Sequence, residues 1–306
     1  FSATCQRLMN NKEVLMVDDW IANAYEGMSR RQFLAKMSAA GATLAGFAVA
    51  ASPVAGEIIT TSTNGLTAAD GKVPSGDFQL PIYEARPAAP GKYPVVLVIP
   101  EVFGMHEHIK DVARRFAKGG YLGITFEPYA REGGVAHLSD LTEVRKVVDP
   151  VPDARVMGDL DALVAYVKKH PAARADRIGV TGFCRGGMYT LLFAAHSREV
   201  KAAVPWYGPI KPDKTPGVRT AGPLDLVGQI HAPILGLYGA EDLGIPVADV
   251  KEMEAALKAA GKTAEFVIYP GAPHAFFADY RPSYRAEAAK DGWGRCLAFF
   301  NKYLKG

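Results

Sequence analysis

Short, wholly apolar runs alternate with helical periods from about residue 93 to the end of the chain. The run at residues 93–100 has no polar interruption, as expected of a strand that helices cover on both faces. Repeated alternation of such strands with helices predicts an α/β fold with a mostly parallel central sheet and helices on both faces. In this class, functional side chains gather at the carboxyl ends of the strands. Further strands are predicted at residues 122–126, 177–182, 202–207, 233–238 and 265–269, and helices at residues 108–118, 154–169, 187–196, 247–260 and 283–304.

The residues before this alternation divide into two parts. Residues 58–63 and 78–84 carry β-branched residues between turn formers, which predicts an initial antiparallel pair of strands. One α/β domain of residues 57–306 then accounts for most of the chain, and 49% hydrophobic residues suffice for one large core. Residues 1–56 are left as an N-terminal extension.

Charge and cysteine content exclude several classes of partner and site. The 35 basic and 32 acidic side chains nearly balance, so a one-sided basic surface for nucleic acid is not expected. The three cysteines, Cys5, Cys184 and Cys296, are too few and too scattered for a disulfide framework. No cysteine and histidine cluster has the spacing of a zinc site, so no metal is expected. Each cysteine has to be interpreted alone.

The N-terminal extension contains an export pattern. Arg30 and Arg31 precede an uncharged stretch at residues 37–56 that is rich in alanine and glycine and ends in small residues. This order resembles a twin-arginine signal, which implies export to the periplasm by the twin-arginine machinery and no stable membrane insertion after cleavage. Two other interpretations stay open. The stretch reaches the ~20 residues that span a bilayer, so it could be an uncleaved anchor, or the arginine pair could precede a buried helix.

A candidate nucleophile lies between the strand predicted at residues 177–182 and the following helix. Cys184 has glycines two residues before and after it, in Gly182-Phe183-Cys184-Arg185-Gly186. This spacing permits the sharp, strained strand-to-helix turn of a nucleophile elbow, with sulfur in place of a serine oxygen. Free N–H groups of the helix start favour a thiolate and an oxyanion there. The alternative is a small buried cysteine in a tight turn.

An acid and a histidine follow the cysteine in the order that an elbow hydrolase requires. Asp242 stands just past an apolar strand, and His274 stands at the tip of a turn after the next strand. The sequence therefore predicts a triad of Cys184, Asp242 and His274, all at carboxyl ends of strands. Glu241 is an adjacent competitor for the acid, and Asp242 could instead cap the helix that follows it.

Four segments together resemble the dienelactone hydrolase family over roughly residues 57–306. They are the elbow, Gly239-Ala240-Glu241-Asp242, Pro273-His274-Ala275-Phe276, and Pro100-Glu101-Val102-Phe103-Gly104. The resemblance implies the α/β-hydrolase fold. It also implies that Glu101 contacts the resting thiol and moves when substrate binds, and that the backbone N–H groups of Val102 and Arg185 form the oxyanion hole.

The substrate contacts implied by the resemblance are incomplete in this chain. Arg131 falls where the family has an arginine that binds the substrate carboxylate. The second such arginine would fall at Ala278, and the serine usually found after the histidine is Ala275. Arg281, three residues beyond Ala278, is a candidate replacement. The chemistry of the family is therefore expected more firmly than the dienelactone substrate.

Three aromatic residues complete the expected pocket, and an apolar core role is the alternative for each: Phe103, Trp206 and Tyr207. The predicted reaction is attack of the Cys184 thiolate on a lactone or activated ester, followed by hydrolysis of the thioester. No cofactor is expected, and His106-Glu107-His108 is interpreted as a solvated helix start. Other small electrophilic esters are an alternative substrate class. A non-catalytic binding protein with a redox-sensing thiol is an alternative from another class.

Overall fold

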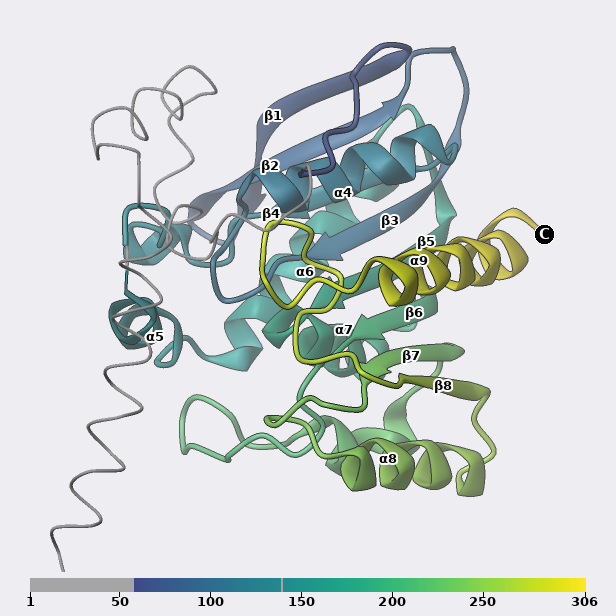
Figure 1. Cartoon of the computed structure of the whole chain (residues 1–306). Coiled ribbons are helices and arrows are strands. Elements are labelled where there is room, and N and C mark those ends of the chain that lie inside the picture. The colour runs from purple at the N-terminus through teal and green to yellow at the C-terminus, as the bar shows by residue number, and fades with distance from the viewer. Residues whose placement is uncertain (1–57, 139) are drawn as a thin grey trace, which may run out of the picture.

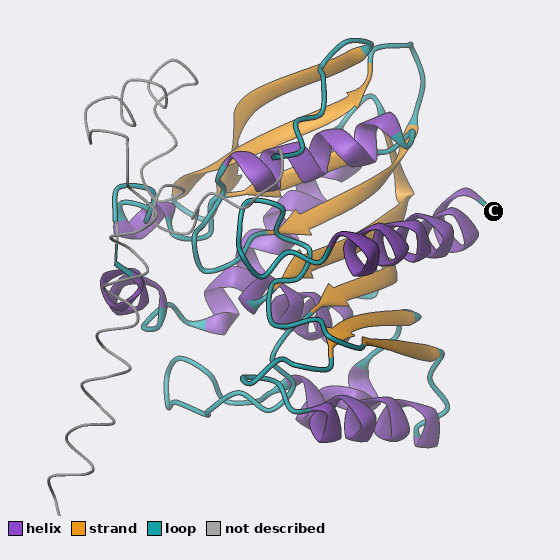
Figure 2. Cartoon of the chain, viewed as in Figure 1, coloured by secondary structure: helices purple, strands orange, loops and turns teal. Residues whose placement is uncertain are grey.

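The computed structural model describes residues 58–138 and 140–306, which form a sheet between two layers of helices (Figures 1 and 2). The sheet has the order β1-β2-β4-β3-β5-β6-β7-β8. Its strands are β1 (Leu66–Ser75), β2 (Phe78–Pro87), β3 (Tyr93–Ile99), β4 (Leu122–Phe126), β5 (Ala173–Phe183), β6 (Val200–Trp206), β7 (Ile234–Gly239) and β8 (Ala264–Tyr269). The helices are α4 (Glu107–Lys118), α5 (Leu141–Val148), α6 (Asp153–Lys169), α7 (Arg185–His196), α8 (Val247–Ala259) and α9 (Ala286–Phe300), with short helical segments η1 (Ala130–Glu132), η2 (Pro223–Gln229) and η3 (Asn301–Lys305).

The predicted fold class is confirmed. Strands β3 to β8 pair in parallel, whereas β2 pairs antiparallel with both β1 and β4. Helices α4 and α9 cover one face of the sheet, and α6 and α7 cover the other (Figure 1). Because the parallel strands run in one direction, their carboxyl ends meet along one edge. The loops after β3, β5, β6, β7 and β8 therefore share this edge of the molecule.

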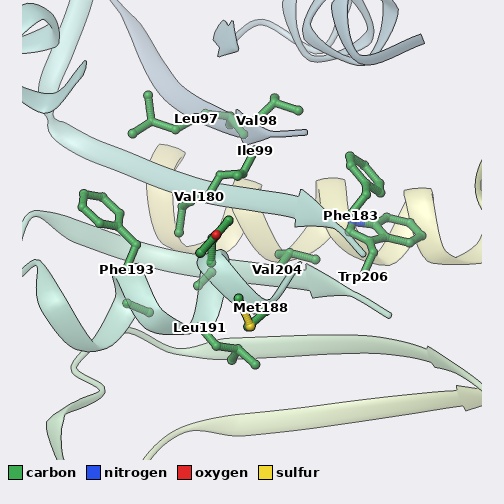
Figure 3. Close-up of a cluster of buried hydrophobic side chains, with 14 of the residues drawn as sticks. Leu97, Val98, Ile99, Val180, Phe183, Met188, Leu191, Phe193, Val204 and Trp206 are labelled. Carbon is green, nitrogen blue, oxygen red and sulfur yellow. The ribbon is translucent and has the colours of Figure 1, made fainter. Parts of the chain in front are cut away.

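The core lies on both faces of the central strands, which explains their continuous apolar sequences. Figure 3 shows Val180 of β5 between side chains of β3, β6 and α7, and these side chains are buried. Close packing requires glycine in places. A Cβ at Gly123 of β4 would lie 2.6 Å from the carbonyl oxygen of Ala113, so only glycine lets α4 approach this strand.

The prediction of a strand at residues 58–63 is wrong, because the first strand is β1. Its last residue, Ser75, pairs with Phe78 across a tight turn. Residues 58–63 instead lie along α4, where the Thr61 N–H donates to Asp111 Oδ1 at 2.6 Å. Ile59 is 44% exposed, so its apolar side chain does not mark a buried strand face. Side-chain hydrogen bonds from α4, rather than a strand partner, fix this segment.

Helix α5 was not predicted, although its sequence carries a start signal. The Asp140 carboxylate accepts hydrogen bonds from Thr142 N–H at 2.6 Å and Glu143 N–H at 3.2 Å, as an N-cap does. The helix has only eight residues, too few to reveal an apolar period. The predicted extension and export signal at residues 1–56 lie outside the described residues. Within the described ranges, no helix is long and apolar enough to cross a membrane.

Candidate active site

Cys184 occupies a strained turn between β5 and α7. Its backbone angles are φ 55° and ψ −122°, and its N–H donates to the Trp206 carbonyl at 3.1 Å. A Cβ at Gly182 would lie 2.3 Å from the Gly186 carbonyl oxygen, and one at Gly186 would lie 2.3 Å from the Ile99 carbonyl oxygen. The glycines flanking the cysteine are therefore required, because the first turn of α7 presses against β5 and the end of β3.

Asp242 and His274 lie side by side on the loops after β7 and β8. His274 Nδ1 is 2.6 Å from Asp242 Oδ2. The other carboxylate oxygen, Oδ1, accepts hydrogen bonds from Gly244 N–H at 2.9 Å and Ile245 N–H at 3.1 Å. Asp242 is only 6% exposed, so these contacts hold it rigidly. Its two oxygens thus divide the two roles considered for it, capping the turn and orienting the imidazole. The competitor Glu241 is exposed.

The electrostatic surroundings of His274 favour its protonated form. Burial lowers the pKa of His274, but the charge of the Cys184 side chain and hydrogen bonds to Asp242 and Cys184 outweigh this effect and raise the pKa to about 10. Ala275, directly after the histidine, has φ 60°. The ring of Tyr207 meets the imidazole edge-on, with 5.1 Å between ring centroids. The imidazole thus interacts with both the thiol and the carboxylate of the predicted triad.

Val102 and Arg185 follow the carboxyl ends of β3 and β5. Val102 is in the turn after β3, and Arg185 is the first residue of α7. N–H groups in the first turn of a helix lack partners within the helix. The Arg185 side chain is engaged elsewhere, because its Nη1 donates to the Val148 carbonyl at 2.9 Å and its Nη2 pairs with Asp149. Only the backbone of Arg185 is thus available to stabilise an oxyanion.

Glu101 is buried and bonded to the loop that follows His274. Its Oε2 accepts hydrogen bonds from the Tyr280 hydroxyl at 2.7 Å and from Arg281 Nη2 at 3.1 Å. Burial raises the pKa of Glu101, but the positive charge of Arg281 and the contact with His106 outweigh it and hold the pKa well below its usual range. Among the described residues, no hydrogen bond joins Glu101 to Cys184. The expected contact with the thiol is therefore replaced by contacts with Tyr280 and Arg281.

Arg281, the candidate replacement for the family arginine expected at position 278, lies beside Glu101. Its guanidinium stacks 4.6 Å from the centroid of the Phe103 ring, and the charge of Cys184 also acts on it. Burial lowers the pKa of Arg281, but the charges of Glu101 and the other neighbours outweigh burial, so the net pKa lies above the usual value. Phe103 is half-buried. A permanently charged fork therefore lies in the same part of the fold as the candidate nucleophile.

Arg131 has a different environment from the one that the sequence predicted. Its Nη1 lies 2.9 Å from Oδ2 of Asp159, a fully buried carboxylate on α6. Its Nη2 donates to the Ser75 carbonyl at 3.1 Å, and its guanidinium lies 4.6 Å from the Phe78 ring centroid. These contacts tie η1 to the β1–β2 hairpin and α6. The structure therefore favours a structural role for Arg131 over binding of a substrate carboxylate.

The two aromatic residues at the end of β6, Trp206 and Tyr207, also differ from the expected pocket wall. Trp206 is completely buried, and its ring centroid lies 4.5 Å from that of Phe277. A Cβ at Gly292 of α9 would lie 2.8 Å from its ring, so Trp206 packs directly against this helix. Trp206 is therefore a core residue. Tyr207 is also buried, but it touches His274, and burial raises its pKa well above the usual value.

The expectation of a solvated helix start at residues 106–108 is wrong in one respect. Helix α4 does begin at Glu107, but His106 and His108 are only 2% and 4% exposed. His108 Nδ1 lies 3.2 Å from Asp279 Oδ1, and burial lowers the pKa of His106. Over residues 58–138 and 140–306, no group of three or more histidine, cysteine or acidic side chains is arranged to hold a metal ion.

Tyr280 is the site residue that the sequence analysis missed. Its ring packs against both His106 and His108, with centroid distances of 5.3 and 5.0 Å, while its hydroxyl donates to Glu101. Nothing in the sequence distinguishes it from the other 12 tyrosines of the chain, since its role depends on the fold of the loop after His274. Its neighbour Arg281 was found only because an expected arginine was missing nearby.

Comparison with known proteins agrees with this architecture. Residues 80–304 match the family model described as "Dienelactone hydrolase family". A protein of Methylorubrum extorquens named "Putative carboxymethylenebutenolidase" is 50% identical over 90% of this chain and 94% of its own length. A protein of Escherichia coli K12 with the same name is 45% identical over 84% of this chain and 95% of its own.

A solved structure gives the same result at the level of the fold. The crystal structure described as "Putative Dienelactone Hydrolase from Klebsiella pneumoniae" is 46% identical, has a TM-score of 0.75, and covers 78% of this chain and 99% of its own. The family match extends from β2 to the C-terminal turn and includes every loop that carries a candidate site residue. The chain therefore belongs to the dienelactone hydrolase family, as a hydrolase on the α/β-hydrolase fold.

Proposed function

We propose that the chain hydrolyses a lactone or activated ester with Cys184 as nucleophile, His274 as general base and acid, and Asp242 as the residue that orients the imidazole. The observation that carries this proposal is the contact of 2.6 Å between His274 Nδ1 and Asp242 Oδ2, next to a cysteine held in a strained elbow. A buried cysteine in a tight turn would need neither partner. A redox sensor would not need an acid and a base in this order.

The proposed reaction has two steps. The Cys184 thiolate, paired with the His274 imidazolium, attacks the carbonyl carbon, and the imidazolium gives its proton to the leaving oxygen of the substrate. Water then attacks the thioester and gives a proton to the neutral His274, while the thiolate leaves and the carboxylic acid is released, which restores the ion pair. Backbone N–H groups of Val102 and Arg185 are proposed to stabilise the oxyanion in both steps. A thiolate is itself a good leaving group, so enolates and other weakly basic leaving groups suit this site.

Arg281 is proposed to bind an anionic group of the substrate. Its guanidinium is charged and planar, it contacts Glu101 and Phe103, and the charge of Cys184 acts on it. A substrate carboxylate would compete with Glu101 for this guanidinium. The release of Glu101 is then proposed to accompany substrate binding. The names of the curated relatives point to a carboxymethylene-substituted butenolide, which has both a lactone and a carboxylate.

Trapping of the acyl-enzyme tests this proposal. The full chain is mixed with an enol ester, quenched in acid within the first turnovers and digested for mass spectrometry. We expect the acyl group on the peptide that contains Cys184, while the peptide that contains the buried Cys296 stays unmodified. Acylation elsewhere, or turnover without acylation of Cys184, would count against the assignment.

A further inference from the structure

Glu127 joins the loop after β3 to the loop after β4. Its Oε2 accepts a hydrogen bond from the Met105 N–H at 2.7 Å, and its Oε1 accepts one from the Tyr129 N–H at 3.1 Å. Its own N–H donates to the Pro81 carbonyl at 3.0 Å, which fixes its backbone against the start of β2. The carboxylate therefore connects the two loops, with one oxygen bonded to each.

The loop that Glu127 holds is the one that carries site residues Glu101, Val102 and Phe103. Gly104 in this loop has φ 70°, and a Cβ there would lie 2.4 Å from Glu127 Oε2, so the carboxylate lies directly against its backbone. The Gly104 N–H donates to the Glu101 carbonyl at 3.2 Å and closes the turn. A change at the carboxylate thus acts on the backbone that places the Val102 N–H and the Glu101 side chain.

We propose that Glu127 is a positioning residue that holds residues 101–105 in the geometry needed for hydrolysis, and that protonation of its carboxyl group loosens this loop. The inference rests on the proposed function, since this loop matters to the reaction only if Val102 and Glu101 act as described above. A carboxylate accepts hydrogen bonds from backbone N–H groups more strongly than a neutral carboxyl group does. Loss of the charge therefore weakens the contacts with Met105 and Tyr129.

The surroundings of Glu127 bring its protonation into the physiological range. Burial and the negative charge of Glu132 raise the pKa of Glu127, the two backbone hydrogen bonds lower it, and the result is about 7. Glu127 also lines a cavity of about 360 Å³, which gives protons access to it. The two backbone hydrogen bonds to the Glu127 carboxylate are thus at full strength above pH 7 and weaken as the pH falls through 7. Two ion pairs lie around Glu127: Glu132 with Arg155, and Arg131 with Asp159. The other titratable groups there are His137, on the cavity wall, and Tyr129.

The amide signal of Met105 reports on this contact without any substrate. In the ¹⁵N-labelled full chain, we expect its proton shift to change with a midpoint near pH 7 between about pH 5 and pH 9. Glu127→Gln should abolish this transition, since an amide does not titrate but keeps a carbonyl for the Met105 N–H. Glu132→Gln should move the midpoint to lower pH, because it removes a negative charge. Glu143→Gln on α5, the matched control, should leave the midpoint unchanged.

Kinetics then connect the contact to hydrolysis. We expect kcat of the wild type on an activated ester to fall as the pH drops through about 7, with little change in KM. In Glu127→Gln, kcat should stay at a low level across this window, on the order of 10-fold below the wild-type plateau, an estimate that corresponds to ~1.4 kcal/mol. Glu127→Asp should keep the pH transition at a lower plateau, and it replaces the glutamine variant if that variant does not fold.

Two results would overturn the inference. One is a Met105 transition that persists unchanged in Glu127→Gln, and the other is a glutamine variant with the kcat and pH profile of the wild type. A wild-type chain that shows the Met105 transition but hydrolyses no lactone or ester would support the contact and count against the proposed function instead. The two proposals therefore fail separately.

Discussion

At the scale of single residues, backbone strain is concentrated at the carboxyl edge of the sheet. In residues 58–138 and 140–306, the non-glycine residues with positive φ are Cys184 at 55°, Tyr207 at 37° and Ala275 at 60°. They follow β5, β6 and His274 respectively. Such conformations cost roughly 1–3 kcal/mol each and persist only where the surrounding structure fixes them. Their coincidence with the predicted triad supports the use of this edge for catalysis.

The raised pKa of His274 predicts an unusual titration. A folded-state pKa of about 10 means that the imidazolium persists at neutral pH and is lost as the pH rises through 10. NMR of the ring protons should therefore show His274 titrating far above its ordinary range. His231, whose pKa is lowered by desolvation and by Arg198 and Lys262, is the internal control and should titrate below its ordinary range.

The partner of His274 can be tested in the same spectra. Because the charge of the Cys184 side chain raises the pKa of His274, Cys184→Ala should move the His274 titration to lower pH. A wild-type His274 that titrates near 6.5, or a midpoint that does not move in the variant, would contradict the pairing of thiol and imidazole.

Arg281 predicts a preference for anionic substrates. Arg281→Ala should raise KM for lactones that carry a carboxylate by about 30-fold relative to neutral esters, since a charge-assisted hydrogen bond contributes ~2 kcal/mol. The ratio of the two KM changes is the informative quantity, because loss of the contact with Glu101 affects both substrates equally. Arg285→Ala, at an exposed arginine that bonds backbone carbonyls, is the control. Equal losses on both substrates would show that Arg281 has only a structural role.

At the scale of elements, the pair of Arg131 and Asp159 attaches η1 to α6 and to the β1–β2 hairpin. Asp159 is fully buried, so Arg131→Ala leaves an unpaired buried charge and should lower the free energy of unfolding by about 3 kcal/mol. Arg155→Ala removes a more exposed pair with Glu132 and should cost less than about 1 kcal/mol. Urea denaturation measures both. A normal stability of Arg131→Ala, with a selective rise in KM for anionic lactones, would restore the predicted substrate role.

The elements that could be predicted are those marked by a pattern in their own sequence. Strand β4 was predicted at its observed bounds, and α7 within two residues, because continuous apolar runs and flanking glycines mark them in the sequence. Residues 58–63 were misassigned because their partners are the side chains of Asp111 and Arg115, 50 and 56 residues away. Local sequence does not contain such partners.

The same limit applies to the site. Cys184, Asp242 and His274 stand at strand ends that a sequence pattern can locate, and the structure brings Asp242 and His274 into contact. The environments of Arg131 and Trp206 depend on Asp159 and Phe277, which no motif connects to them. The contact between Tyr280 and Glu101 joins residues 179 positions apart. Sequence therefore located the proposed triad better than the environments of the residues around it.

At the scale of the whole molecule, all loops that carry candidate site residues lie at the carboxyl edge of one sheet, and the family model covers them all. The N-terminal extension is proposed to direct this folded domain to the periplasm. Export after folding would let a reactive thiol mature in the cytoplasm, away from oxidising conditions.

The export proposal predicts that Arg30→Lys combined with Arg31→Lys retains the protein in the cytoplasm, because the transport receptor reads both arginines. Fractionation with a cytoplasmic marker measures this, and the mass of the exported form should place the new N-terminus between about residues 50 and 57. Export of the double variant would remove the twin-arginine interpretation. A full-length mass in the membrane fraction would favour an uncleaved anchor.

The nucleophile is tested most directly by the kcat/KM of Cys184→Ala on an enol ester, with Cys296→Ala as the matched control. Alanine fits the elbow, so the fold should persist, and the loss of the sulfur that interacts with His274 should lower kcat/KM by ~10⁴-fold or more. Cys296 is buried away from solvent and should be dispensable for activity. A folded Cys184→Ala variant that keeps more than about one hundredth of the wild-type kcat/KM would contradict the account.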